Sequence, residues 1–288
     1  MDFLAELSKK QEKINRYLET LISEDGLLQK KIVEAMNYSL LAGGKRIRPV
    51  LMMAVSEAFG ASEDAILPFA AALEMIHTYS LIHDDLPSMD DDDLRRGRPT
   101  NHVVYGEANA ILAGDALLNF AFETALSAPY DAEKKLKATF LMAKASGYLG
   151  MIGGQVVDLE GEKRKLSLSE LKEMHSMKTG ALIKAAAQMG CALAGAGEDE
   201  LSEYAENLGL AFQLKDDILD ETATVAELGK NIGSDKKNDK STFISLCGME
   251  QTEEMLVEAT DKAISALNGI ENSGFLKEFA MYLLKRRT

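Results

Sequence analysis

The 288-residue sequence has no tryptophan, only five prolines and two cysteines, and no uninterrupted run of 18 apolar residues. Cys191 and Cys247 are far apart and lack metal-ligand spacing, so we expect reduced thiols in a cytoplasmic protein. A membrane-spanning helix needs about 20 mostly apolar residues, and the charged amino terminus lacks the apolar segment of a signal peptide. The sequence therefore predicts a cytoplasmic protein without a membrane span.

The chain also has fewer basic than acidic residues, 32 against 46, so its formal net charge is −14. This excess of acid argues against non-specific nucleic-acid binding, which depends on lysine and arginine. An anionic substrate would require basic residues or a metal ion to reverse the field locally. The hydrophobic fraction of 46% is sufficient for a sizeable core.

Few prolines and many alanines and leucines favour helix. No segment alternates between apolar and polar residues as a strand would, and no Pro-, Gly- or Ser-rich linker divides the chain. We predict one all-α domain over residues 1–288, an antiparallel helical bundle. The expected helices span residues 3–22, 27–41, 50–59, 68–82, 107–126, 132–149, 168–195, 198–219, 250–267 and 275–286. Glycines 150–154 and the segment 98–106 are expected to be non-helical.

Two capping boxes are predicted from the pattern of a hydroxyl residue followed three positions later by glutamate. They are Ser167 with Glu170, and Thr224 with Glu227, the second starting a short helix.

The most informative stretch lies at the end of the apolar segment 68–82. Six aspartates fall between residues 84 and 93, and three arginines between residues 95 and 98. A run of like charges is most often a solvated surface loop. Carboxylates at the end of an apolar helix also suit a hard cation such as Mg²⁺, which binds one or two carboxylates plus substrate phosphates. Arginines suit the phosphates themselves, so the first hypothesis is a Mg²⁺–diphosphate site.

A second acidic cluster lies in residues 212–220, FQLKDDILD. Asp216 and Asp220 are four residues apart and share a helix face, whereas Asp217 turns partly aside. Alone, this pattern is as typical of an exposed helix face as of a metal site. Paired with the first cluster it is far more specific, because facing helices of a bundle often build metal sites together.

A basic segment, GGKRIRP at residues 43–49, joins two expected helices. Its glycines, Gly44 among them, allow a ligand to approach the backbone closely, and Lys45 and Arg48 suit a phosphate. Glycine-plus-basic turns are common, so this segment alone is weak evidence for a site.

Taken together, these motifs resemble those of the trans-polyprenyl diphosphate synthases over nearly the whole chain, and in particular the bacterial farnesyl type. The matching segments, in the family's order, are GGKRIRP (43–49), EMIHTYSLIHDDLPSMDDDDLRRG (74–97), GGQ (153–155), MKTG (177–180), FQLKDDILD (212–220) and GKNIGSDKKNDKST (229–242). The resemblance implies helices around a deep central cavity (the isoprenoid synthase fold), usually a homodimer. It implies head-to-tail condensation of isopentenyl diphosphate with an allylic diphosphate, dimethylallyl or geranyl.

The resemblance also implies roles for individual residues. Two to three Mg²⁺ ions per site would be held by Asp84, Asp85, Asp90, Asp216 and Asp220. The allylic diphosphate would be bound by Arg95, Lys178, Lys230 and Lys240. The isopentenyl diphosphate would be bound by Gly44, Lys45, Arg48, His77 and Arg96. Thr179 and Gln213 would place oxygen dipoles near the carbocation, with Lys178 counted among the catalytic residues. The family uses the released diphosphate as the base, so no protein base is assigned, and His83, His102 and His175 are interpreted as structural.

Product length is expected to depend on the two positions that lie five and four residues before the first aspartate, as in the family. They are Tyr79 and Ser80. Tyr79 lies about 7.5 Å from Asp84 along a helix axis, where its ring could form the floor of a tail-binding cavity. With the Pro87–Ser88 insertion, this pattern predicts a C15 product.

Four alternatives remain open at this stage. A geranylgeranyl diphosphate synthase (C20) would share the fold and chemistry. A terpene cyclase would have an aspartate-rich cluster but no need of a second diphosphate site. A non-catalytic subunit would be expected to have lost a cluster or its basic partners, and an acidic Ca²⁺-binding module would not explain the arginines and lysines.

Overall fold

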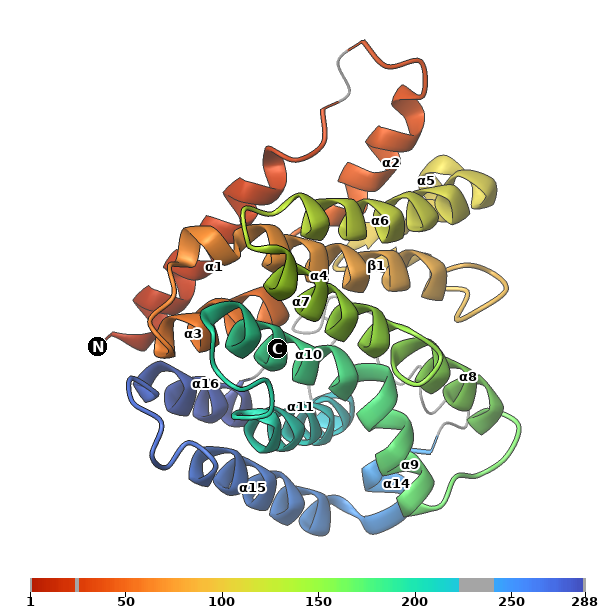
Figure 1. Cartoon of the computed structure of the whole chain (residues 1–288). Coiled ribbons are helices and arrows are strands. Elements are labelled where there is room, and N and C mark those ends of the chain that lie inside the picture. Colours follow the sequence, from red (N-terminus) through yellow and green to blue (C-terminus); the bar gives the residue numbers. More distant parts are fainter. Residues whose placement is uncertain (1, 24–25, 223–240, 287–288) are drawn as a thin grey trace.

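The computed structural model describes residues 2–23, 26–222 and 241–286, and helices make up nearly all of it (Figure 1). The all-α prediction is confirmed: among the described residues, the strands are the two-residue β1 (Leu94–Arg95) and β2 (Arg98–Pro99), which pair as a hairpin. The helices are α1 (Phe3–Glu19), α2 (Lys30–Leu40), α3 (Ile47–Ala58), α4 (Glu63–Asp84), α5 (Asn101–Tyr105), α6 (Glu107–Ser127), α7 (Ala132–Ser146), α8 (Met151–Gly161), α9 (Leu168–His175), α10 (Ala181–Ala194), α11 (Ser202–Thr222), α14 (Phe243–Cys247), α15 (Met249–Ser265) and α16 (Gly274–Lys285). A π-helical turn, η1 (Ser176–Gly180), joins α9 to α10.

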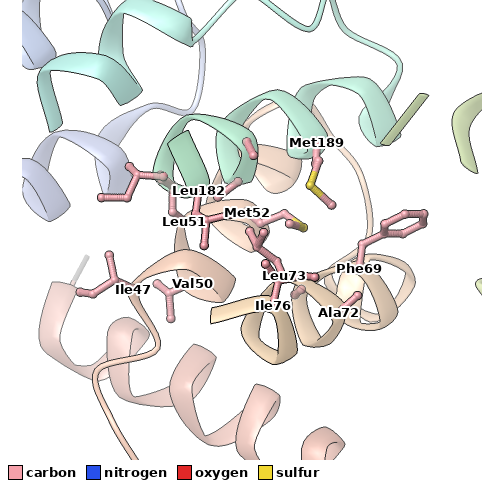
Figure 2. Close-up of a cluster of buried hydrophobic side chains, with 14 of the residues drawn as sticks. Ile47, Val50, Leu51, Met52, Phe69, Ala72, Leu73, Ile76, Leu182 and Met189 are labelled. Atoms are coloured by element: carbon pink, nitrogen blue, oxygen red, sulfur yellow. The ribbon is translucent and has the colours of Figure 1, made fainter. Parts of the chain in front are cut away.

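Helix α4 runs through the centre of the fold and is buried along most of its length. It packs against α3, α6 and α10, and Figure 2 shows the core that α3, α4 and α10 build around Leu73 and Ile76. The helix begins at Glu63, five residues before the predicted start at 68, because Ser62 caps it by accepting a hydrogen bond from the Asp64 amide. Pro68 therefore lies inside the helix. The far end of this rigid element carries Asp84.

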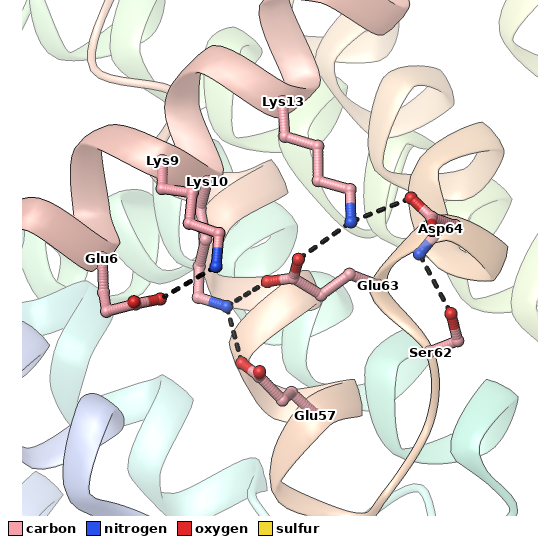
Figure 3. A network of polar contacts seen from close by, with 8 residues as sticks. All are labelled: Glu6, Lys9, Lys10, Lys13, Glu57, Ser62, Glu63 and Asp64. Carbon is pink, nitrogen blue, oxygen red and sulfur yellow. Dashed lines mark hydrogen bonds and ion pairs between the residues drawn. The ribbon is translucent and has the colours of Figure 1, made fainter.

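The amino-terminal end of α4 is tied to α1 by ion pairs (Figure 3). Lys10 is fully buried, and its ammonium group contacts Glu57 at 2.6 Å and also Glu63. Lys13 lies 2.9 Å from Glu63 and 2.8 Å from Asp64. Because a buried ammonium is costly unless it is paired, these carboxylates fix where α1 lies on the α3–α4 turn.

Two segments differ from the prediction. Residues 98–106, expected to be a loop, form β2 and α5. Gly150 lies in the break between α7 and α8, as expected, but Gly153 and Gly154 lie in the first turn of α8 rather than interrupting the helix. Gly154 is required there by packing, because a Cβ at this position would lie 2.6 Å from the Cα of Lys178. This glycine therefore permits the close approach of α8 to η1.

The predicted helix 168–195 and its Ser167–Glu170 capping box are confirmed, although the helix widens into a π turn in its middle. The predicted Thr224–Glu227 capping box lies outside the described residues. Cys191 is buried and Cys247 is partly buried, and neither forms a disulfide.

By length and composition, α4 and α6 are each apolar enough to cross a membrane. In α4, 72% of the apolar window is buried within the fold, as expected of a core helix. In α6 the buried share is 39%, so this helix keeps apolar residues at the surface.

Candidate active site

A cavity of about 620 Å³ lies between α4, α6, α8 and η1. Its polar end contains Arg48, His77, Asp84, Gln155, Lys178 and Thr179. Its walls are mostly apolar and include Met89, Leu118, Ile152, Val156 and Leu159. His83 and Asp115 also line the cavity, but the rest of its lining is mostly apolar, so it suits a ligand with an anionic head and a hydrocarbon tail.

Asp84 is the last residue of α4 and lies at the polar end of the cavity. Gln155 donates a hydrogen bond to its Oδ1 atom, and the Lys178 ammonium lies 3.9 Å from Oδ2. Burial raises the pKa of Asp84 to about 6, with Lys178 opposing and Asp90 reinforcing the shift. Asp90 is held nearby because its amide donates to the Asp84 carbonyl at 2.9 Å. An additional cation here would offset the repulsion between these carboxylates.

Lys178 reaches the cavity from η1 and lies between two acids. Its ammonium is 2.6 Å from Asp158 and 3.9 Å from Asp84. Single π turns inside helices occur often at functional sites, because they change the direction in which side chains point. Here the turn places Lys178 and Thr179 together on the cavity wall.

Asp85 and Arg95 pair with each other, which the sequence did not predict. The Nε atom of Arg95 lies 2.7 Å and 3.0 Å from the two Asp85 oxygens, and Nη2 lies 2.5 Å from Oδ1. Burial raises the pKa of Asp85, and the Arg95 charge opposes that shift. The structure thus places this pair beside the cavity, along a smaller pocket, rather than on the cavity wall.

The basic segment 43–49 reaches the cavity through Arg48, which lies in the first turn of α3. Arg48 lines the cavity, and its Nε atom is buried without a hydrogen-bond partner among the described residues. Burial lowers the pKa of Arg48, while the charges of Glu74 and Asp216 oppose that shift. The neighbouring His77 is neutral, because burial and then the Arg48 charge hold its pKa well below the usual value. A buried donor beside a cavity fits an anionic group.

Gly44 is required by the position of Arg96. The Arg96 guanidinium donates to the Gly43 carbonyl, and a Cβ on Gly44 would lie 2.6 Å from its Cζ atom. Gly44 also has a φ of +123°, which L side chains rarely adopt. The Lys45 carbonyl accepts a hydrogen bond from Gln11 at 2.8 Å.

The second acidic cluster approaches the cavity through α11. Gln213 donates to the Thr179 hydroxyl at 3.2 Å, and Thr179 lines the cavity. One turn further along, Asp216 accepts a hydrogen bond from Arg286 at 2.6 Å. Asp216 does not line the cavity itself, although its charge acts on Arg48, which does. The two clusters are therefore linked through η1, because Lys178 lies near Asp84 of α4 and Thr179 accepts a hydrogen bond from Gln213 of α11.

Arg286 is held in place by more than one interaction. Its guanidinium lies 4.2 Å above the Phe212 ring and donates to the Phe212 carbonyl at 3.0 Å. Asp217 has a different role from Asp216, because it accepts a hydrogen bond at 2.7 Å from the amide of Phe243, the first residue of α14.

Comparison with known proteins shows that residues 29–271 match the Polyprenyl synthetase family. The chain belongs to this family. Farnesyl diphosphate synthase of Micrococcus luteus is 44% identical to it over 277 residues, with 95% of each chain covered. The large subunit 1 of the heterodimeric geranylgeranyl pyrophosphate synthase of Arabidopsis thaliana is 45% identical, covering 94% of this chain and 75% of the relative.

Solved structures agree with this assignment. The apo FPP/GFPP synthase of Zymomonas mobilis superposes with a TM-score of 0.89 at 34% identity, covering 98% of this chain and 99% of the other. A geranyltransferase of Helicobacter pylori, solved with magnesium and isoprenyl diphosphate, superposes with a TM-score of 0.87 at 31% identity, covering 99% and 97%. This family member is therefore a prenyltransferase of isoprenoid biosynthesis.

The donor set at the cavity suits the metal of such an enzyme. Among the described residues, no group of three or more His, Cys, Asp or Glu side chains forms a complete metal-binding cluster. Mg²⁺ does not need one, since it binds few carboxylates and takes its remaining ligands from phosphates and water. Asp84, which lines the cavity, and Asp90, whose charge acts on it, would fit this requirement, and the raised pKa of Asp84 reflects the burial and acid crowding that a cation would offset.

Some functional side chains were missed from the sequence. Gln155 and Asp158 hold Asp84 and Lys178 in place, and Arg286 binds Asp216. Gln155 belongs to a motif that had been singled out, and its spacing of three from Asp158 on a helix was an available indication. The predicted diphosphate ligands Lys230 and Lys240 lie outside the described residues.

Proposed function

We propose that this prenyltransferase condenses isopentenyl diphosphate with dimethylallyl diphosphate and then with geranyl diphosphate, and releases farnesyl diphosphate (C15). The observation that carries the product length is the position of Tyr79. Its side chain is buried, lines the cavity and lies about one and a half turns of α4 before Asp84. Burial raises the pKa of Tyr79 to about 12, so the phenol stays neutral, and its hydroxyl has no hydrogen-bond partner among the described residues. A neutral ring at this depth is a suitable floor for a hydrocarbon tail.

The residues at the polar end of the cavity would have different roles in the reaction. Bound Mg²⁺ would neutralise the diphosphate that leaves as the allylic C–O bond breaks, and we assign Asp84 and Asp90 as its ligands, with Asp216 and Asp220 on the facing helix. Lys178 would place a positive charge beside the same leaving group.

Other residues would handle the second substrate and the cation. Arg48 and Arg96 would hold isopentenyl diphosphate, with neutral His77 as a hydrogen-bonding partner. The Thr179 and Gln213 oxygens would face the allylic cation, and the apolar walls would exclude water from it.

The Asp85–Arg95 ion pair changes the assignment of these two residues. Because each already satisfies the other in a largely buried position, we propose that this pair fixes the loop after α4. Asp85 would then act on the metal only through that loop, and Arg95 would present its remaining donors to the allylic diphosphate.

The floor is tested by Tyr79→Ala. Removing the ring opens the end of the cavity, so we expect the main product to lengthen by at least one C5 unit, measured by mass spectrometry after incubation with both C5 substrates and Mg²⁺. Tyr79→Phe keeps the ring and should keep the C15 product. A wild-type product of C20 would instead favour geranylgeranyl diphosphate synthesis, which the similarity to the Arabidopsis relative also supports.

We further propose that two copies of the chain form a homodimer through the neighbouring helices α6, α7 and α8. Large apolar side chains on these helices are between 45% and 64% exposed: Leu112 and Phe140 do not line the cavity, whereas Ile111, Ile152 and Val156 also line it. Adjacent exposed apolar residues of this kind are typical of an interface.

Leu112→Glu should therefore convert a dimer to a monomer at micromolar concentration, because an unpaired charge is costly inside an apolar interface. Light scattering measures the mass. Leu4→Glu, on an equally exposed apolar residue of α1, is the matched control and should remain dimeric. A wild-type protein that is monomeric at this concentration would contradict the proposal.

A further inference from the structure

The His83 ring of α4 lies directly against Gly114 of α6. A Cβ on Gly114 would lie within 2.8 Å of three His83 ring atoms, Nε2, Cδ2 and Cε1. Such a separation is shorter than real Cβ atoms show, so no residue other than glycine fits with the ring in this position. The His83 Nε2 atom is also 3.0 Å from the Ile111 carbonyl oxygen and 4.0 Å from an Asp115 oxygen. The ring therefore packs against one turn of α6, residues 111–115.

The same ring forms part of the cavity wall. It meets the Tyr79 ring edge to face, with centroids 5.8 Å apart and planes at 77°. From α6, Ile111, Asp115 and Leu118 line the cavity at the helical spacing of the face that carries Gly114. The width of the cavity next to Tyr79 thus depends on how closely the His83 ring packs against α6.

We propose that Gly114 is a specificity-determining residue: by leaving room for the His83 ring inside α6, it keeps the cavity wide enough to accept the ten-carbon allylic tail for a second condensation. The inference rests on the proposed C15 synthesis and extends it to a residue on a different helix from Tyr79. Gly114 touches no reacting atom, and it acts through the position of His83.

A methyl group at position 114 would displace the ring in a defined direction. The backbones of α4 and α6 are packed along much of their length, and α4 is buried over most of its course, although Ser80, Leu81 and His83 near its end are only partly buried. The α6 backbone blocks one side of the ring and Tyr79 lies along the helix, so the ring would shift on its open side, which borders the cavity. The displaced ring would occupy volume that the longer allylic tail needs and would leave room for the shorter one.

The experiment compares Gly114→Ala with wild type in the full-length protein with Mg²⁺. We expect the ratio of C10 to C15 product to rise about tenfold, the scale of discrimination that one methyl-sized change in a pocket gives. The KM for geranyl diphosphate should rise by a similar factor, and the KM for dimethylallyl diphosphate should change less than about twofold. Gly274→Ala adds a methyl group at a helical position with no atom within 4 Å, and it should leave the ratio unchanged.

A double variant separates this mechanism from general damage. Gly114→Ala combined with His83→Ala removes the ring that the new methyl group displaces, so synthesis of C15 or longer products should return. A folded Gly114→Ala protein with the wild-type product ratio would overturn the inference, and so would a double variant that keeps the single variant's ratio. If Gly114→Ala does not fold, His83→Ala decides: a wider cavity should shift products toward longer chains, and an unchanged distribution overturns the inference.

These comparisons are made against the wild-type distribution. A wild type that releases C20 would refute the proposed product, while the shift produced by Gly114→Ala would still test the role of the glycine.

Discussion

Asp84→Asn is expected to lower kcat by about 10³-fold, the scale seen when one group that stabilises developing charge is removed. Asparagine keeps the shape of the side chain and can still pair with Gln155, but it lacks the negative charge that a Mg²⁺ ligand provides. The activation of turnover by Mg²⁺ should also shift to higher metal concentration. Steady-state rates with geranyl and isopentenyl diphosphates, measured over a Mg²⁺ titration, give both quantities.

The control for this variant lies in the same cluster. Asp93 is exposed and its carbonyl accepts the Thr100 amide, so Asp93→Asn removes one acidic charge and leaves that backbone bond intact. It should keep kcat within about twofold of wild type, as a solvated side chain would. Equal losses for the two variants would show that total acidity matters rather than the Asp84 position. Full turnover in EDTA would contradict the metal assignment altogether.

Asp84→Asn, which should lower activity, should raise the stability of the fold when no metal is present. Burial raises the folded-state pKa of Asp84 from 3.8 to about 6, so above pH 6 the folded protein holds a charge that is more favourable in the unfolded chain. The resulting cost is absent below pH 3.8, grows as pH rises through that window, and is complete above pH 6. Asp84→Asn removes this cost. At pH 7 without Mg²⁺, the free energy of unfolding of the variant should therefore be higher than that of wild type by about 1–3 kcal/mol, measured by denaturant unfolding. Wild type and variant should converge in stability near pH 4.

The acid clusters and their helices could be predicted because their information is local. Asp84 ends an apolar segment that has to be buried, and Asp216 lies on a helix whose apolar face is visible in the spacing. The Ser167–Glu170 capping box is likewise a four-residue pattern, and it forms as predicted. Tyr79 was singled out by the resemblance to the family, helical geometry gave its distance from Asp84 along α4, and the structure places its ring on the cavity wall.

What the sequence does not reveal depends on partners that are distant in the chain. Asp85 has the same chemistry as Asp84, and only the hairpin that returns Arg95 distinguishes them. The contact of Arg286 with Asp216 joins residues 70 positions apart. Gly114 has no sequence feature that marks it, because its constraint is the ring of a residue on another helix. Gly153 and Gly154 misled the prediction, since glycine marks a break and a close approach equally well.

The π turn connects these distant groups. Through Lys178 it contacts Asp84 and Asp158, and through Thr179 it contacts Gln213, one turn from Asp216. A π turn contains one more residue than a regular α-helical turn. Without that residue, the residues that follow would be rotated by about 100° around the helix axis, and the contacts made by Lys178 and Thr179 would be separated. Both halves of the active site are therefore positioned by five residues, which makes Lys178 the most informative of them to change.

Lys178→Met is expected to reduce kcat by about 10²-fold, because it removes a positive charge next to the leaving diphosphate while it keeps an unbranched side chain of similar length. It also leaves the partly buried Asp158 without the ammonium that lies 2.6 Å away. Lys178→Arg keeps the charge and should recover part of the loss. Lys172→Met, on an exposed lysine of α9, is the matched control and should retain wild-type turnover. Single-turnover rates with geranyl diphosphate isolate the chemical step. If Lys178→Met kept that rate and only weakened substrate binding, the lysine would bind the ground state and would have no part in stabilising the departing diphosphate.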